Sequence, residues 1–273
     1  MKALLLAFGL ACLASLPVHA EESDADRAER WQDLKHVVFG DRTVIDGSAM
    51  VALEAPSRAQ DAALVPIAVT LPNSDGAASA DKVKAIYIVV DENPSPLAGT
   101  FHFGPLANPR SLKTRVRVDQ YTLMHAVAET NDGRLFATSR FVKAAGGCSA
   151  PSTKDPQLAL ARLGKMRARL EGDAPLAEGK AATVQLLISH PNNNGMQVDQ
   201  ITHNFIPARF IQDIDVSYGD QLIFKVDADI SLSEDPVITF GFMPRGAGPL
   251  RVRMLDSTRA TFHQEFPLDA GRS

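Results

Sequence analysis

The sequence predicts an all-β protein made of two Ig-like antiparallel β-sandwich domains, which a cysteine-bearing linker joins and a short N-terminal helix precedes. Short runs rich in Val, Ile, Phe and Thr recur along the 273-residue chain, and 18 glycines and 17 prolines separate them. Strands of this length and spacing are typical of an antiparallel sandwich. The chain is also long enough for two domains of about 100–130 residues each.

Residues 1–20 have the pattern of a secretory signal peptide. Lys2 supplies the positive start, an apolar run covers residues 3–16, and Pro17 to Ala20 forms a cleavage site. We therefore expect an exported, periplasmic protein with no membrane segment. A lipoprotein with Cys12 as its lipid acceptor is the alternative, which a poor glycine at the start of that motif disfavours.

Residues 21–143 are predicted to form the first domain, which begins with a helix. Apolar residues of Asp24 to Val38 recur three and four positions apart, as on one helical face. Trp31, the only tryptophan, lies on that face, so we expect it to dock the helix on the domain; stacking on a ligand is the alternative. Strands are expected at residues 50–53, 65–70, 83–90, 100–103, 112–118, 121–129 and 135–142.

Two further features of this first domain concern polar residues. Arginines alternate with valines in residues 115–118, which predicts a strand with one wet face. Asn131 to Arg134 has the composition of a hairpin turn. Asp91 and Glu92 open a proline-rich loop, and we interpret them as a solvated turn rather than a pair of catalytic carboxylates.

Residues 163–273 are predicted to form the second domain. Apolar and basic residues alternate at the start of it, as in an edge strand rather than a basic nucleic-acid patch. A long turn is expected at His190 to Gly195. Strands are expected at residues 166–170, 181–189, 205–211, 214–218, 221–227, 237–243, 248–255 and 260–266.

Residues 144–162 form the predicted linker, and they contain the most informative stretch of the chain. Gly146 and Gly147 precede Cys148, which becomes the single cysteine once the signal peptide is removed with Cys12. Small flanking residues predict a mobile arm, and a thiolate is a strong nucleophile. We expect Cys148 to hold a substrate covalently; an incidental surface cysteine is the alternative.

Other classes of site find little support in the sequence. Removing Lys2 with the signal peptide moves the net charge from −4 to −5, which disfavours bulk nucleic-acid binding. His190 and His203 lack further ligands at zinc spacing, and a structural hydrogen bond is the expected role of His190. Phosphate loops, nucleophile elbows and dinucleotide motifs are missing, so we expect no cofactor, metal or catalytic residues.

Several segments resemble a known family when they are taken in order. In the first half these are residues 53–56, 65–67, 93–94 and 114–117, followed by the Gly-Gly-Cys tether; in the second half they are residues 187–191, 195 and 206–211. The chain resembles SoxY fused to SoxZ, the two subunits of the periplasmic sulfur carrier of thiosulfate oxidation. The resemblance implies two Ig-like sandwiches packed as an internal pseudo-heterodimer, with Cys148 carrying sulfur intermediates.

The chain departs from the family pattern at two places. The tether continues into a second domain as Gly-Gly-Cys-Ser-Ala instead of ending the chain, and Asn192 to Asn194 replaces the usual Met-Glu-Thr. These departures resemble the fused, quinoprotein dehydrogenase-associated SoxYZ-like carriers, whose cargo is open. The implied partners are periplasmic redox or sulfur-processing enzymes, such as c-type cytochromes or a quinoprotein dehydrogenase.

Three functional hypotheses follow from these observations. The first is a non-enzymatic covalent carrier that holds its cargo, a sulfur species, on Cys148. The second is a thiol redox enzyme, which would need a resolving cysteine that the mature chain lacks. The third is an accessory module for a periplasmic quinoprotein dehydrogenase system, with no covalent cargo.

Overall fold

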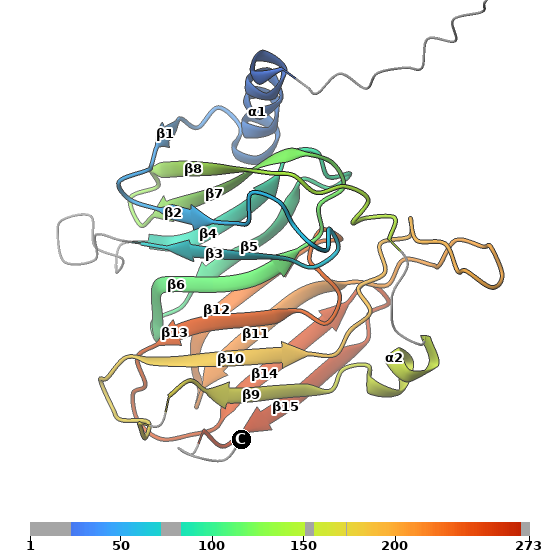
Figure 1. The fold of residues 1–273 in the computed structure, drawn as a ribbon. Coiled ribbons are helices and arrows are strands. Elements are labelled where there is room, and N and C mark those ends of the chain that lie inside the picture. Colours follow the sequence, from blue (N-terminus) through green and yellow to red (C-terminus); the bar gives the residue numbers. More distant parts are fainter. Residues whose placement is uncertain (1–22, 72–82, 151–155, 173, 269–273) are drawn as a thin grey trace, which may run out of the picture.

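The computed structural model describes residues 23–71, 83–150, 156–172 and 174–268, so the predicted signal peptide lies outside the described residues. Two β-sheets stack face to face, and the predicted all-β fold class is confirmed (Figure 1). In spatial order, the larger sheet contains β1 (Val44–Asp46), β8 (Leu135–Val142), β7 (Thr122–Thr130), β4 (Val83–Val90), β5 (Leu97–Phe103), β12 (Gln221–Ala228), β11 (Ile211–Tyr218), β14 (Leu250–Asp256) and β15 (Thr261–Phe266). The smaller sheet contains β2 (Ala52–Glu54), β3 (Val65–Thr70), β6 (Ala107–Val116), β13 (Val237–Phe242), β10 (Ala182–Ile188) and β9 (Met166–Leu170).

Both sheets run without interruption from the first half of the chain into the second. β5 pairs with β12 in the larger sheet, and β6 pairs with β13 in the smaller one, both antiparallel. Edge strands of the two halves thus satisfy each other's backbone groups, which removes two exposed edges. The halves are therefore joined by two rows of backbone hydrogen bonds as well as by the linker, which the linker sequence did not predict.

One apolar core extends through both halves, as the shared sheets require. Phe224 lies at the junction, with its ring centroid 4.7 Å from that of Phe240 and 6.3 Å from that of Phe101. All three side chains are buried. Burial of large aromatic side chains contributes strongly to stability, so the junction is a part of the core rather than a docking surface between separate bodies.

The N-terminal helix α1 (Asp24–Phe39) begins at Ser23, whose side chain accepts a hydrogen bond from the backbone of Asp26 in a capping box. Trp31 stacks on His125 of β7 with 3.6 Å between ring centroids, which confirms that it docks the helix on the first half. α1 covers the end of the larger sheet near β8 and β7 (Figure 1). Among the described residues no helix is long and apolar enough to cross a membrane.

Several predicted elements agree with the structure, one predicted strand does not, and β1 has no counterpart among the predicted strands. β9 is an edge strand as expected, and a second helix, α2 (Pro156–Arg162), occupies the end of the linker. The strand expected at residues 205–211 is wrong, because β11 begins only at Ile211. Residues 189–210 instead form a long loop whose backbone is held mainly by side chains and by two isolated bridges.

Candidate functional site

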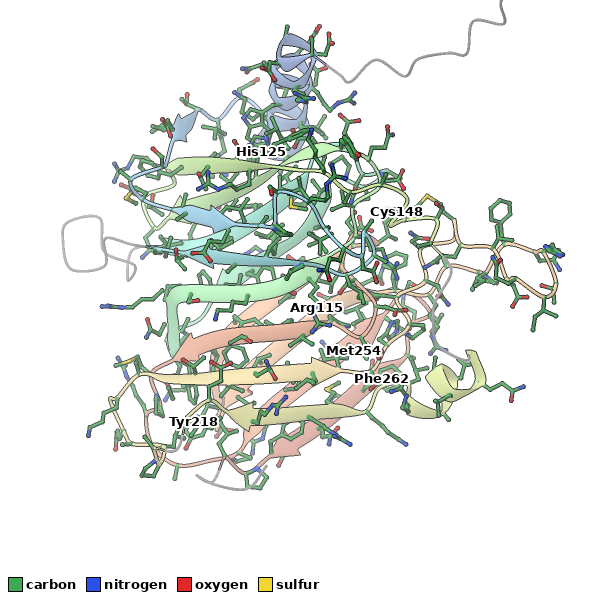
Figure 2. The ribbon with its side chains drawn as sticks, viewed as in Figure 1. Arg115, His125, Cys148, Tyr218, Met254 and Phe262 are labelled. Carbon is green, nitrogen blue, oxygen red and sulfur yellow. The ribbon has the colours of Figure 1, made fainter. Side chains whose placement is uncertain are left out.

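Residues 144–150 turn back against the end of the sandwich after β8, and this turn carries Cys148 (Figure 2). The amide of Gly146 donates to the carbonyl of Asp119 at 2.7 Å, and that of Gly147 donates to the carbonyl of Val118 at 2.9 Å. A hydrogen bond from Ala150 to Gly146 closes the turn at 2.8 Å. The segment is therefore docked on the loop that follows β6.

Gly147 allows this docking through its lack of a side chain. A Cβ atom added at Gly147 would lie 2.1 Å from the carbonyl oxygen of Ala62 and 2.5 Å from that of Val118. Real Cβ atoms do not approach backbone oxygen so closely, so only glycine fits. Gly146 has a different role, because its φ of +80° lies in the left-handed region that favours glycine.

The second half of the chain holds the same segment from the opposite side. The side-chain amide of Asn194 donates to the carbonyl of Cys148 at 2.7 Å. Asn192 donates to the carbonyls of Leu232 and Ser233 at 3.0 and 2.9 Å, and this fixes the asparagine turn. Both asparagines are buried. Cys148 thus lies in a clasp to which both halves contribute.

Arg117 lies beneath the clasp, and its side chain is only 1% exposed. Its Nη1 donates to the carbonyl of Gly147 at 3.2 Å, and its Nη2 donates to that of Asn192 at 3.3 Å. Nε is buried without a partner in the described structure. Burial lowers the pKa of Arg117, while the negative charge of Glu234, which acts from a distance, opposes that shift.

The alternation of arginine and valine in residues 115–118 predicts a strand whose arginines face solvent. This prediction is wrong at Arg117. This side chain would face solvent on an isolated strand, but the cysteine segment and the asparagine turn cover it. Arg115, two residues earlier, is partly exposed as expected. Sequence reasoning missed Arg117 and Asn194 because the segments that bury them come from distant parts of the chain.

The Cys148 thiol is 1% exposed, in contrast to the expectation of a thiol with nothing packed around it. Burial, and next the negative charge of Asp119, raise the pKa of Cys148 to about 12, whereas Arg117 favours the thiolate. At neutral pH the docked cysteine is therefore a protonated thiol, which is a poor nucleophile. In this position the thiol is shielded from solvent and protonated.

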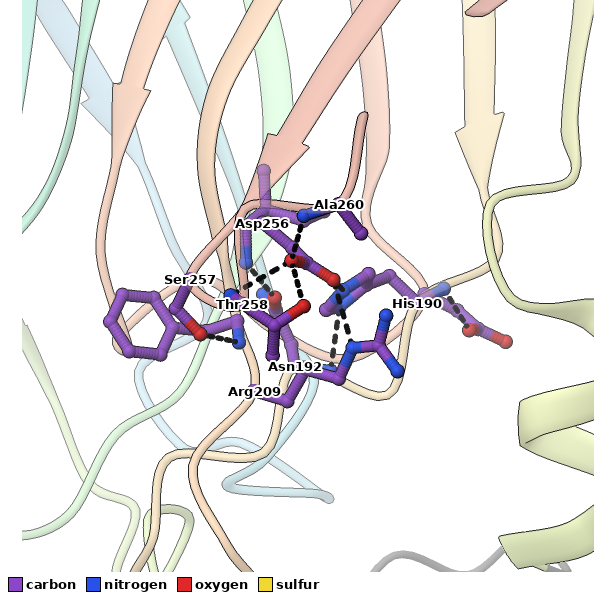
Figure 3. Close-up of polar contacts among 10 residues, drawn as sticks. His190, Asn192, Arg209, Asp256, Ser257, Thr258 and Ala260 are labelled. Atoms are coloured by element: carbon purple, nitrogen blue, oxygen red, sulfur yellow. Dashed lines mark hydrogen bonds and ion pairs between the residues drawn. The ribbon is translucent and has the colours of Figure 1, made fainter. Parts of the chain in front are cut away.

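His190 anchors the loop that supplies the asparagines (Figure 3). Its Nδ1 accepts a hydrogen bond from the amide of Asn192 at 3.1 Å, which confirms the expected structural role. Asp256 lies beside the ring with Oδ2 3.6 Å from Nε2, and it also binds Nε of Arg209 at 2.8 Å. Burial lowers the pKa of His190 to about 4, so the ring is neutral at pH 7.

A second polar pair lies under α1, apart from the cysteine. Asp91 is buried, so the prediction of a solvated turn is wrong at this residue. Its Oδ2 lies 3.1 Å from Nε2 of His125. A cavity of about 840 Å³ opens between α1 and the larger sheet, beside Trp31 and Phe141. The described residues contain no group of three or more metal-ligating side chains.

Comparison with known proteins relates each half of the chain to a different family model. Residues 35–148 match the model described as sulfur oxidation protein SoxY, and residues 171–267 match that of sulphur oxidation protein SoxZ. The SoxY match ends at Cys148, and the SoxZ match includes the asparagine turn. No curated protein sequence matches the chain.

Solved structures give two further comparisons. The sulfur carrier protein SoxY from Chlorobium limicola f thiosulfatophilum is 24% identical, with a TM-score of 0.35, over 44% of this chain and 96% of that one. A beta-glycosidase from Bacteroides vulgatus is 7% identical, with a TM-score of 0.25, over 80% of this chain and 24% of that one.

Proposed function

The chain belongs to the SoxYZ family, with a SoxY region and a SoxZ region in one polypeptide, and from this premise we propose that it is a covalent sulfur carrier rather than an enzyme. In this proposal Cys148 holds the cargo and presents it to partner enzymes in the periplasm. The predicted signal peptide at residues 1–20 would deliver the chain there. Residues 21–143 and 163–273 would be the SoxY-like and SoxZ-like domains, and residues 144–162 the tether.

The observation that carries the proposal is the position of Cys148 in a clasp formed by both halves. A cysteine that served only packing would need no such contacts, but here the carbonyl of Cys148 accepts from the buried Asn194 and the carbonyl of the preceding Gly147 accepts from the buried Arg117. A hydrogen-bonded turn can also leave its site without disrupting a β-sheet. The clasp therefore supports a thiol that is kept protected and is released to react.

Thiol chemistry allows loading without a cofactor. The Cys148 thiolate attacks one sulfur atom of a disulfide-type donor, a new S–S bond forms, and the second sulfur leaves with the electron pair of the broken bond. Unloading is the same exchange in reverse, with a partner thiolate as the attacking group. Both steps conserve electrons, so the carrier itself needs no redox centre.

Partner enzymes must reach the thiol at the end of the sandwich. Unlike a tether that ends its chain, this one continues into α2, so its travel is limited by two anchors. A periplasmic c-type cytochrome or quinoprotein dehydrogenase that handles the cargo would therefore have to bind close to the clasp. Thiosulfate is the cargo of the family's best-known pathway, and for this chain we leave the sulfur species open.

Replacement of Cys148 tests the proposal directly. We expect Cys148→Ser to abolish the pathway activity that the wild-type gene restores in a deletion strain, because serine cannot form the S–S bond. Ser149→Ala is the matched control and should restore full activity. Full activity of Cys148→Ser would contradict the carrier function and favour an accessory module without covalent cargo.

A further inference from the structure

Arg117 is a buried cation without a close anionic partner. Both of its donated hydrogen bonds end on neutral backbone carbonyls, and its Nε has no partner. Within the described ranges no carboxylate oxygen lies within 4 Å of its guanidinium. A buried charge costs several kcal/mol unless an opposite charge compensates it. A site that holds only a neutral thiol does not explain this cost.

The charges around the clasp act on Cys148 in opposite directions, because Asp119 disfavours a negative charge there and Arg117 favours one. Glu234 and Asp61 act on Arg117 only from a distance, and the thiol itself is protonated in the docked position. Nη1 of Arg117 binds the carbonyl of Gly147, the residue directly before Cys148. A group attached to Sγ that displaced this carbonyl would free the donors of Nη1, in addition to the unpartnered Nε on another edge of the guanidinium.

We propose that Arg117 determines the charge of the cargo, by binding an anionic group that is carried on Cys148. This inference rests on the proposed carrier function and deepens it. The guanidinium offers charged N–H donors, and a sulfonate or another oxyanion has several oxygens that can accept them. Neutral or cationic groups would leave Arg117 without an acceptor once the segment is displaced.

Two reagents of equal length and opposite charge provide the probes. Sulfonatoethyl and trimethylammonioethyl methanethiosulfonate each react with the Cys148 thiolate, which forms a mixed disulfide and expels methanesulfinate with the electron pair of the broken S–S bond. Dithiothreitol then removes either group by thiol–disulfide exchange and restores the thiol. The rate of removal from the folded protein, divided by the rate from the denatured chain, reports how well each group is held.

We expect the folded wild-type protein to release the anionic group roughly tenfold more slowly than the cationic group, as for the loss of one hydrogen-bonded charge pair. Arg117→Met should remove most of this difference. Arg115→Met is the matched control from the same stretch of chain, and it should keep the wild-type ratio. Arg117→Lys retains the charge without the planar fork and should give an intermediate ratio.

The wild-type protein alone provides a second readout in case Arg117→Met does not fold. The anionic adduct should melt at a higher temperature than the cationic adduct, and salt should reduce the difference. Equal release rates and equal melting temperatures would overturn the role of Arg117 while leaving Cys148 as a carrier. Absence of any native adduct on Cys148 would overturn the carrier function, whatever the charge preference in these assays.

Discussion

At the scale of single residues, the clasp shields the Cys148 thiol from solvent and keeps it protonated. Gly147 permits the close approach, Asn194 binds the cysteine carbonyl, and the thiol becomes buried with a raised pKa. The two glycines suggested mobility, yet one of them is required for tight packing. Reactivity of Cys148 should therefore depend on how often this turn leaves its site.

Removal of the Asn194 side chain should increase that frequency. We expect Asn194→Ala to raise the rate of Cys148 alkylation by iodoacetamide by about two- to tenfold, the equivalent of one net hydrogen bond. Asn193→Ala is the control, because among the described residues the side chain of Asn193 makes no hydrogen bond to the cysteine segment. Equal rates for the two variants would show that Asn194 does not hold the turn.

A methyl group at position 147 should have a larger effect. Gly147→Ala places Cβ against the carbonyls of Ala62 and Val118, so the segment cannot dock as it does in the wild type. We expect alkylation of Cys148 to approach the rate of the denatured chain. Gly146→Asn keeps a residue that tolerates a positive φ and should leave the thiol protected. A protected thiol in Gly147→Ala would contradict the docked geometry.

At the scale of elements, the loop of residues 189–210 helps to hold the cysteine segment in place, a role that its sequence does not suggest. A strand was expected in its second part, because residues 205–211 are mostly apolar, but Phe205 is 71% exposed and makes only an isolated bridge. Its first part is fixed by buried side chains of Asn192 and His190. Such side-chain anchoring has no periodicity, so a search for periodic patterns does not find it.

The His190 anchor should make stability depend on pH. Its pKa is about 4 in the folded protein and 6.5 in a free side chain, so the stabilisation is complete above pH 6.5 and is lost as pH falls toward 4. Between pH 7 and pH 5 this loss amounts to about 2 kcal/mol. Denaturant unfolding should show a weaker pH dependence in His190→Asn than in the wild type. The exposed His203→Asn should behave like the wild type, and an unchanged slope in His190→Asn would refute the assignment.

At the scale of the whole molecule, the two halves form one continuous sandwich. Alternation and turn residues were sufficient to predict most strands, including β3, β4 and β8 at their observed bounds. The pairing of β5 with β12 and of β6 with β13 joins residues more than 100 positions apart. Local patterns do not contain such pairings, and the burial of Arg117 depends on them as well.

The shared core predicts a single cooperative unfolding transition. Calorimetry should give equal van't Hoff and calorimetric enthalpies, because neither half keeps its sheet edges or its core without the other. Phe224→Ala should destabilise the whole transition by about 3–5 kcal/mol. Phe205→Ala, which removes an exposed ring, should leave it unchanged. Two resolved transitions would show that the halves fold independently.

Intact mass spectrometry of the protein isolated from its native cells without reductant decides whether Cys148 carries a covalent cargo. We expect a mass above that of the bare chain, with the added mass localised to the peptide that contains Cys148 and removed by dithiothreitol. The mass difference would also narrow the identity of the cargo. A bare thiol, or only a disulfide-linked dimer, in cells that are using the pathway would show that Cys148 carries no cargo.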